Sequence, residues 1–170
     1  RLPRLLQPTL NRLSMETGES FSATVLDGEE VVIVARAGPT RVLAYGVHLG
    51  ARLPAHATST GLVLLASLSD AGLAEWLGDR RLARLTPHTV VEPEALRVRL
   101  AQIRADDFCE AHQTHELGVL ALAVPLRDAR GDTLAAPNVV VSATGPEPER
   151  LRRDLLPAMQ EAAGALRPLL

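Results

Sequence analysis

The first part of the chain changes from a helical to a strand-like pattern of apolar residues. Apolar side chains recur every three or four positions near the N-terminus, which predicts a helix over 3–17. Two β-rich runs follow, 20–26 and 31–37, and the Asp27-Gly28 pair between them is typical of a hairpin turn. The second run begins with four apolar residues in succession, as expected for a strand in the middle of a sheet.

The middle of the chain has a mainly helical pattern. A stretch of small and polar residues over 49–61 leads into apolar, helix-prone sequence. The clearest helix carries its apolar residues on one face and charged residues on the other. The predicted elements are a weak strand over 42–47, helices over 62–68, 71–77 and 92–104, and a loop over 86–91.

The last part returns to strands and ends in a helix. Pro137 falls inside a predicted strand and indicates an edge position or a bulge, because proline cannot donate a ladder hydrogen bond. Pro157 falls inside the final helical pattern and is expected to kink or split it. The predicted elements are strands over 108–112, 119–127 and 134–142, a turn over 128–132 and a helix over 147–170. The complete order predicts an α+β fold with a mostly antiparallel sheet flanked by helices.

Composition narrows the class of protein. The chain has 170 residues, enough for one domain over 1–170, and 46% of them are hydrophobic, which is too many for a disordered segment. A single cysteine cannot build a disulfide framework, and no apolar run is long enough to span a membrane. The net charge of −2 argues against nucleic-acid binding by these residues. We therefore expect a soluble, cytoplasmic globular domain.

The start of the sequence suggests a piece of a longer protein. Arg1 stands in place of an initiating Met, and no signal peptide follows it. The sequence begins directly inside an amphipathic helical pattern. We expect a further part of the protein upstream of this helix.

The densest group of metal-ligating residue types is Cys109, His112 and His115. This spacing could bring three ligands within reach of one ion. The alternative is a polar strand end in which Cys109 is an ordinary buried residue. No second group with zinc-site spacing occurs elsewhere, so the alternative is favoured and we expect no bound metal.

Three hydroxyl side chains, Thr58, Ser59 and Thr60, lie close to His56 before the helix that we expect to follow Gly61. Nucleophilic catalysis needs a base held against the hydroxyl and an acid to orient that base. No G-x-S-x-G motif and no nearby acidic residue supports it. Hydroxyls in this position more often cap a helix or bind an anion at its N-terminus.

Arginines also flank this region of the sequence. Arg36, Arg41 and Arg52 lie near the predicted second and third strands and the polar stretch, and a planar guanidinium suits a carboxylate ligand. For any one of these arginines, a place on the solvent-exposed rim of the sheet is the simpler interpretation. No glycine-rich phosphate loop is present. The residues thus indicate a small-molecule pocket at the helix start after Leu53, without a catalytic constellation.

Several segments resemble one known family. Residues 49–66, LGARLPAHATSTGLVLLA, resemble the loop and helix that mark the effector-binding domain of IclR-type bacterial transcription regulators. Segments similar to the rest of that domain follow in the same order: TPHTVV at 86–91, LRVRLAQIRADDF at 96–108, HELGVLALAVPLRD at 115–128 and AAPNVVVS at 135–142. DGEEVVIVAR at 27–36 is most similar to the subgroup that regulates aromatic-acid catabolism, in the protocatechuate and 4-hydroxybenzoate branch.

The resemblance implies the effector-sensing half of a two-domain regulator. It implies a GAF-like or profilin-like sheet flanked by helices, which senses a small carboxylic or aromatic acid and is neither an enzyme nor dependent on a cofactor. Operator DNA would be bound by an N-terminal winged helix-turn-helix domain outside this chain, in a homodimer or homotetramer. The alternatives are a ligand-free dimerisation module and a small hydrolytic or metal-dependent enzyme.

The resemblance also implies which residues contact the effector. In the family the effector occupies a cavity between the sheet and the LPAHATSTG loop over 53–61. The matching positions are Tyr45, Leu53, Ser59, Thr60, Gly61, Ala111, Val119, Ala121, Asn138 and Val140. Because aromatic residues make up only 2% of the chain, a pocket with aliphatic walls and polar ends is expected rather than an aromatic cage.

Overall fold

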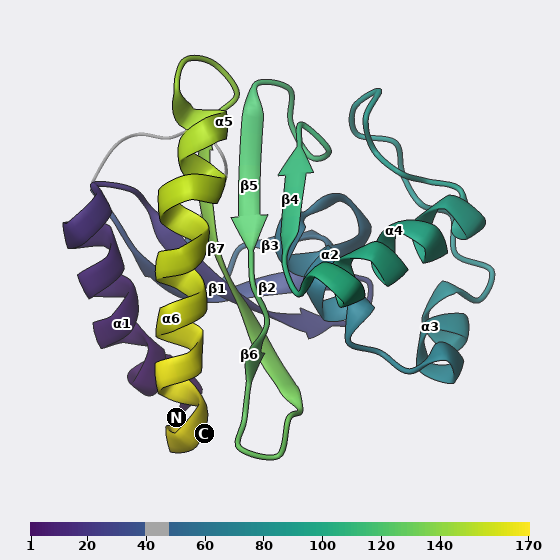
Figure 1. Ribbon diagram of the computed structural model, residues 1–170. Helices are drawn as coiled ribbons and strands as arrows, with labels where there is room; N and C mark the ends of the chain where they lie inside the picture. The colour runs from purple at the N-terminus through teal and green to yellow at the C-terminus, as the bar shows by residue number, and fades with distance from the viewer. Residues whose placement is uncertain (40–47) are drawn as a thin grey trace.

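The computed structural model describes residues 1–39 and 48–170 and has the α+β architecture that the sequence predicts (Figure 1). The predicted strand over 42–47 lies outside the described residues. The strands are β1 (Phe21–Asp27), β2 (Glu30–Ala37), β3 (Arg52–Pro54), β4 (Cys109–His112), β5 (Val119–Ala123), β6 (Leu126–Arg127) and β7 (Thr133–Ser142). The helices are α1 (Leu2–Thr17), α2 (Ser59–Ala66), α3 (Asp70–Leu77), α4 (Pro93–Asp106), α5 (Glu147–Arg150) and α6 (Leu156–Leu166). Short turns complete the list: η1 (Ala55–Ala57), the π-helical η2 (Leu151–Leu155) and η3 (Arg167–Leu169).

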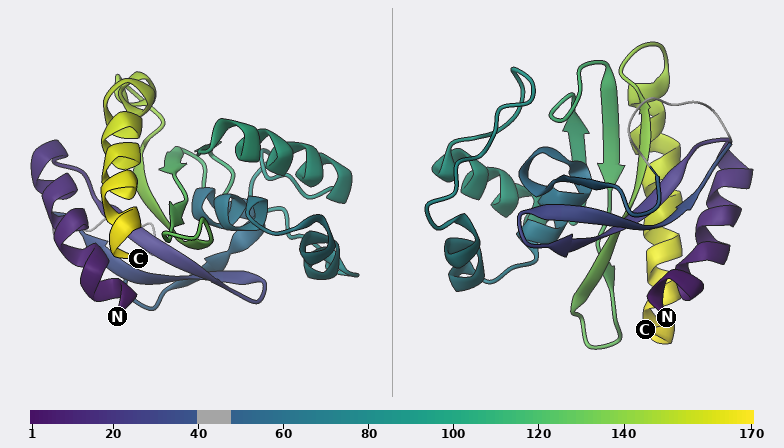
Figure 2. Two further views of the ribbon diagram at one scale, coloured as in Figure 1. Left: turned by 60° about the horizontal axis from the view of Figure 1, so that its bottom comes forward. Right: turned by 180° about the vertical axis from the view of Figure 1, so that it is seen from behind.

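The strands form one antiparallel sheet in the order β3-β2-β1-β7-β5-β4, and β6 extends the pairing along β7. The helices form two groups, with α1 beside α6 and with α2, α3 and α4 on the other side of β5 and β7 (Figures 1 and 2). Each group covers its own apolar core, one built on α1 and α6 and the other on α2 and α4. The described residues contain no helix that is both long and apolar enough to cross a membrane.

A β-bulge lets strand β2 contribute to both cores. Ala35 pairs with Ala23 of β1, and both belong to the core under α1 and α6. The register then shifts by one residue, so that Ile33 pairs with Thr24. An extra residue in one strand turns the following side chains to the opposite face. Ile33 therefore faces the side of the sheet that carries α2.

Pro137 lies in the interior of the sheet, so the prediction of an edge position or a bulge is wrong. It belongs to β7, between β1 and β5, and the register shifts of the described sheet occur elsewhere. The backbone N–H of Val124 donates to the Pro137 carbonyl, which shows that this side of Pro137 faces the two-residue link between β5 and β6. The absent N–H of proline is tolerated because the neighbouring strand is interrupted there.

The other differences concern the ends of elements and strand β3, which lies in the stretch over 49–61 where no strand was predicted. Helix α2 begins at Ser59 rather than at residue 62, and the predicted strand over 119–127 divides into β5 and β6 around Pro125. The final helix is split, as Pro157 predicts, since α6 begins at Leu156 after the π-helical turn. Helix α1 ends at Gly18, whose φ of 76° is left-handed.

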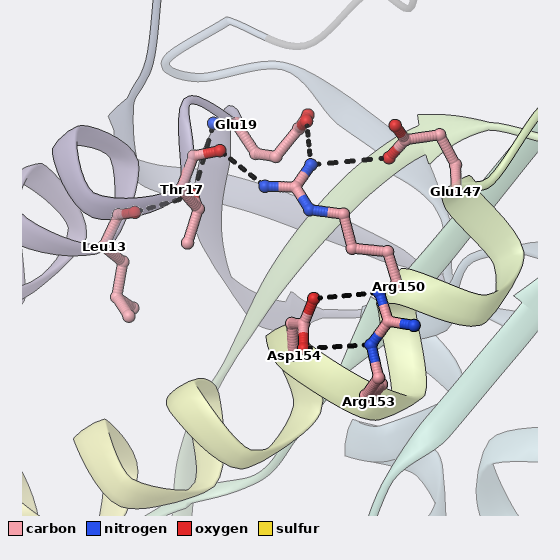
Figure 3. A network of polar contacts seen from close by, with 7 residues as sticks. All are labelled: Leu13, Thr17, Glu19, Glu147, Arg150, Arg153 and Asp154. Carbon is pink, nitrogen blue, oxygen red and sulfur yellow. Dashed lines mark hydrogen bonds and ion pairs between the residues drawn. The ribbon is translucent and has the colours of Figure 1, made fainter.

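Arg150 ties the C-terminal end of α1 to the start of the C-terminal helices (Figure 3). Its guanidinium donates to the Glu19 carboxylate at 2.7 Å and to the Thr17 carbonyl at 2.6 Å, and it forms an ion pair with Glu147 at 3.5 Å. The neighbouring Arg153 forms an ion pair with Asp154 at 3.3 Å. The Arg150 side chain is 26% exposed and that of Arg153 is 67% exposed.

Replacing Arg150 with Met is expected to lower the free energy of unfolding by about 1–3 kcal/mol, because charge-assisted hydrogen bonds shielded from water are lost. Arg153→Met is the matched control and should cost less than about 0.5 kcal/mol, since its ion pair is open to solvent. Urea unfolding of both variants measures the difference. Equal losses would show that Arg150 does not fasten α1.

Candidate functional site

A cavity lies between the N-terminus of α2 and the face of the sheet formed by β1, β7, β5 and β4. Its volume of about 60 Å³ is several times what one water molecule needs. Small polar side chains and aliphatic side chains share the lining. The lining residues are Ser22, Thr24, Ile33, Leu53, Ala57, Thr58, Ser59, Thr60, Ala111, Thr114, His115, Glu116, Val119, Ala121, Asn138 and Val140.

Most of the residues expected to contact an effector meet at this cavity, although they come from five separate elements. The eight are Leu53, Ser59, Thr60, Ala111, Val119, Ala121, Asn138 and Val140. Tyr45 lies outside the described residues. Gly61 is not among the lining residues, and its assignment as a contact residue stays a prediction. It faces the backbone of Ala55, so close that a Cβ would overlap it.

The N-terminus of α2 forms one wall of the cavity. Thr58 is the N-cap, and its hydroxyl accepts a hydrogen bond from the Gly61 N–H at 3.2 Å. Ser59 and Thr60 occupy the first turn, where backbone N–H groups have no carbonyl partner within the helix. The Ser59 hydroxyl is buried and has no hydrogen-bond partner among the residues that the structure describes. A buried hydroxyl at the positive end of a helix suits an anionic ligand.

The described hydrogen bonds do not connect His56 to any of these hydroxyls. His56 is 6% exposed, and its Nε2 lies 2.7 Å from the Ala83 carbonyl oxygen. A catalytic base would have to contact the nucleophile. The arrangement therefore favours a helix cap and a binding surface over a nucleophilic centre.

The sheet supplies a polar floor to the cavity, and two of its residues, Ser22 and Thr24, were not among the contact residues predicted from the sequence. The Ser22 hydroxyl donates to the Asn138 side-chain oxygen at 2.5 Å, which links β1 to β7. The Thr24 hydroxyl is buried and has no hydrogen-bond partner within residues 1–39 and 48–170. The signal available in the sequence was the alternation of Ser22 and Thr24 with apolar residues along the predicted strand. Ile33 could not be assigned in this way, because its direction depends on the bulge.

Hydrogen-bonded loops hold the remaining wall in place. Thr114 lines the cavity, and its hydroxyl donates to the Ala57 carbonyl at 2.8 Å. Thr89 in turn donates to the Thr114 carbonyl at 2.7 Å, and Thr86 donates to the Gln113 carbonyl at 2.6 Å. The loop before α4 thus supports the β4–β5 turn from behind.

The three candidate metal ligands do not meet. Cys109 is fully buried, and burial raises the pKa of its thiol to about 12, against the opposing effect of Arg99. His112 is exposed and pairs with Glu110 at 3.0 Å, while His115 lines the cavity. Over residues 1–39 and 48–170, no three or more His, Cys, Asp or Glu side chains are placed to hold a metal ion. The spacing suggested a cluster, but alternation along β4 sends Cys109 and His112 to opposite faces.

Protonation of His115 is expected to destabilise the fold. Burial lowers the pKa of His115 below 6.5, against the smaller opposing effect of the Glu116 carboxylate. As the pH falls from about 6.5 toward this lower value, the unfolded chain binds a proton before the folded one, so the free energy of unfolding decreases. Urea unfolding at about pH 7.5 and 5.5 should show a smaller decrease for His115→Gln than for the unmodified chain. Identical decreases would contradict this assignment.

Comparison with known proteins places this architecture in one family. The family described as bacterial transcriptional regulator IclR C-terminal matches residues 2–167. The p-hydroxybenzoate hydroxylase transcriptional activator of Acinetobacter baylyi is 42% identical over 99% of this chain. The chain spans 64% of the length of that relative.

Two solved structures share the fold over nearly the whole chain. The inducer-binding domain of a double mutant of the PobR transcription factor from Acinetobacter, in complex with 3-hydroxybenzoic acid, has a TM-score of 0.94 and 42% identity, covering 100% of this chain and 99% of that one. An IclR homologue from Microbacterium hydrocarbonoxydans, in complex with 4-hydroxybenzoate, has a TM-score of 0.85 and 30% identity, covering 98% and 67%. The resemblance seen in the sequence is confirmed. The chain belongs to the IclR family of bacterial transcriptional regulators and corresponds to the C-terminal domain of that family.

Proposed function

We propose that the cavity binds a small aromatic carboxylic acid and that this domain is the effector sensor of a transcriptional regulator. The observation that carries the proposal is the buried Ser59 hydroxyl in the first turn of α2, which has no hydrogen-bond partner among the described residues and lies at one wall of a cavity lined by both polar and aliphatic side chains. Two relatives with this fold are complexes with hydroxybenzoic acids, which supports the same ligand class here.

Each part of the cavity has a role in this proposal. The carboxylate of the effector accepts hydrogen bonds from the first-turn N–H groups of α2 and from the Ser59 hydroxyl. Leu53, Val119 and Ala121 form an apolar wall for the ring. Asn138, held by Ser22, orients the opposite end of the ligand. An open cavity of this kind favours effector binding over a ligand-free dimerisation module, whose interior would be solidly packed.

Sensing requires that the effector bind two conformations of the regulator unequally, because only that difference shifts operator binding. We propose that a winged helix-turn-helix domain outside this chain contacts the operator, in a cytoplasmic homodimer or homotetramer. In this role the domain has no catalytic function and needs no cofactor. The relatives are transcriptional regulators, which agrees with that role.

Calorimetric titration tests the ligand class. We expect 4-hydroxybenzoate, 3-hydroxybenzoate or protocatechuate to bind with a dissociation constant at or below about 100 μM, that is, a binding free energy of roughly −5.5 kcal/mol or better. β-Ketoadipate, glyoxylate and pyruvate serve as non-aromatic comparisons and should bind more weakly. The proposal fails if none of the aromatic acids binds. Preference for a non-aromatic acid would keep the sensor role but change the ligand class.

A further inference from the structure

Arg36 points toward the face of the sheet that carries the cavity. It lies in β2 between Ala35 and Ala37, and both alanines belong to the core under α1 and α6. Successive side chains of a strand point to opposite faces. The Arg36 side chain therefore projects from the other face, where α2 and the cavity lie.

Arg36 continues a row of polar residues across three strands. Its register partner on β1 is Ser22, and the register partner of Ser22 on β7 is Asn138. Both of these residues line the cavity and are hydrogen-bonded to each other. Directly opposite residues have Cβ atoms about 4.5–5.5 Å apart. The row places the arginine within one side-chain length of the Ser22–Asn138 end of the cavity.

The Arg36 guanidinium has no counter-charge from the described part of the chain. Within the described part of the chain, the Arg36 Nε is buried without a hydrogen bond and no ion pair includes the guanidinium. Other strand arginines are paired, Arg52 with Asp27 at 2.6 Å and Arg127 with Asp107 at 2.5 Å. Residues 40–47, TRVLAYGV, contain no Asp or Glu. Because a partly buried cation without a counter-charge is costly, an oxygen acceptor on a ligand would offset part of that cost.

We propose that Arg36 is a specificity-determining residue that recognises an oxygen acceptor opposite the carboxylate of the effector. The inference rests on the proposed function and extends it. The α2 N-terminus holds the carboxylate, and Arg36, beside Ser22 and Asn138, selects acids that carry a second oxygen group at the far end, either a phenolic oxygen or a second carboxylate. The planar fork of a guanidinium suits such oxygen groups. The Thr24 hydroxyl, also unpartnered on this floor, adds a donor.

Three ligands of similar shape test the proposal by calorimetry: benzoate, which lacks the second group, 4-hydroxybenzoate and terephthalate. In the unmodified chain the last two should bind more tightly than benzoate. Arg36→Met should lower the affinity for 4-hydroxybenzoate or terephthalate by about 10- to 100-fold and the affinity for benzoate by less than about 3-fold. The ligand that loses affinity identifies the source of the acceptor, phenolic oxygen or carboxylate.

Two further variants keep the result interpretable. Arg130→Met removes an exposed arginine at the tip of the β6–β7 turn. It should leave the affinities for 4-hydroxybenzoate and terephthalate unchanged relative to the affinity for benzoate. Arg36→Lys keeps the positive charge but loses the planar guanidinium. Its ratio of 4-hydroxybenzoate affinity to benzoate affinity should lie between those of the unmodified chain and Arg36→Met. If Arg36→Met does not fold, the ratio measured for Arg36→Lys tests the proposal in its place. An equal loss for all three ligands, or no loss, overturns the role of Arg36 while leaving the proposed function standing. Failure of every acid to bind the unmodified chain contradicts both.

Discussion

Replacing Gly61 with alanine is expected to destabilise this protein by about 3 kcal/mol or more, the upper range for overpacking a rigid interior. A Cβ at Gly61 would overlap the backbone oxygen and Cα of Ala55, and the Ala55 carbonyl carbon would lie 2.5 Å away. Helix α2 is buried along its whole length, so it cannot move aside without disturbing the core that it covers. Because α2 also presents Ser59 and Thr60 to the cavity, effector binding should be lost together with stability.

Gly164→Ala is the matched control for this experiment. Gly164 lies inside helix α6, and a Cβ there would meet no atom within 4 Å. The substitution should stabilise the protein by about 0.5–1 kcal/mol, through reduced freedom of the unfolded chain and better helix propensity. Urea unfolding at constant pH measures both variants. Similar stabilities for Gly61→Ala and the unmodified chain would show that η1 and α2 are not in the close contact described above.

Replacing Ser59 with leucine is expected to lower effector affinity by about 100-fold or more. The larger side chain would occupy the cavity at the N-terminus of α2 and remove a hydroxyl that hydrogen-bonds the carboxylate, a change of about 3 kcal/mol or more in binding. Ser59→Ala removes only the hydroxyl and should cost about 5- to 20-fold. The alanine variant should be at least as stable as the unmodified chain, because a buried hydroxyl without a partner is removed.

Ser67→Leu provides the control for Ser59→Leu. It makes the same change at the exposed C-terminal end of α2, away from the lining of the cavity, and should leave affinity within about 2-fold. Calorimetric titration with 4-hydroxybenzoate and thermal melting of each variant separate loss of binding from loss of fold. Wild-type affinity in both Ser59 variants would place the carboxylate elsewhere in the cavity.

Local patterns in the sequence predicted most elements of this fold. Helical spacing of apolar residues identified α1 and α4, and Asp27-Gly28 identified the hairpin of β1 and β2. These features depend on residues that are close in sequence, so period and turn chemistry were sufficient to find them. The eight predicted residues that line the cavity were found differently, through resemblance to a family whose pocket is built from the same segments.

Contacts between distant segments were decided only by the tertiary structure. The bulge in β2 turns Ile33 toward the cavity, and the gap between β5 and β6 allows Pro137 inside the sheet. The sequence spacing of Cys109, His112 and His115 suggested a cluster that the strand geometry disperses. The sequence by itself determined most of the elements, their order and the family. The register between strands decided which polar groups meet, because a shift of one residue sends a side chain to the opposite face of the sheet.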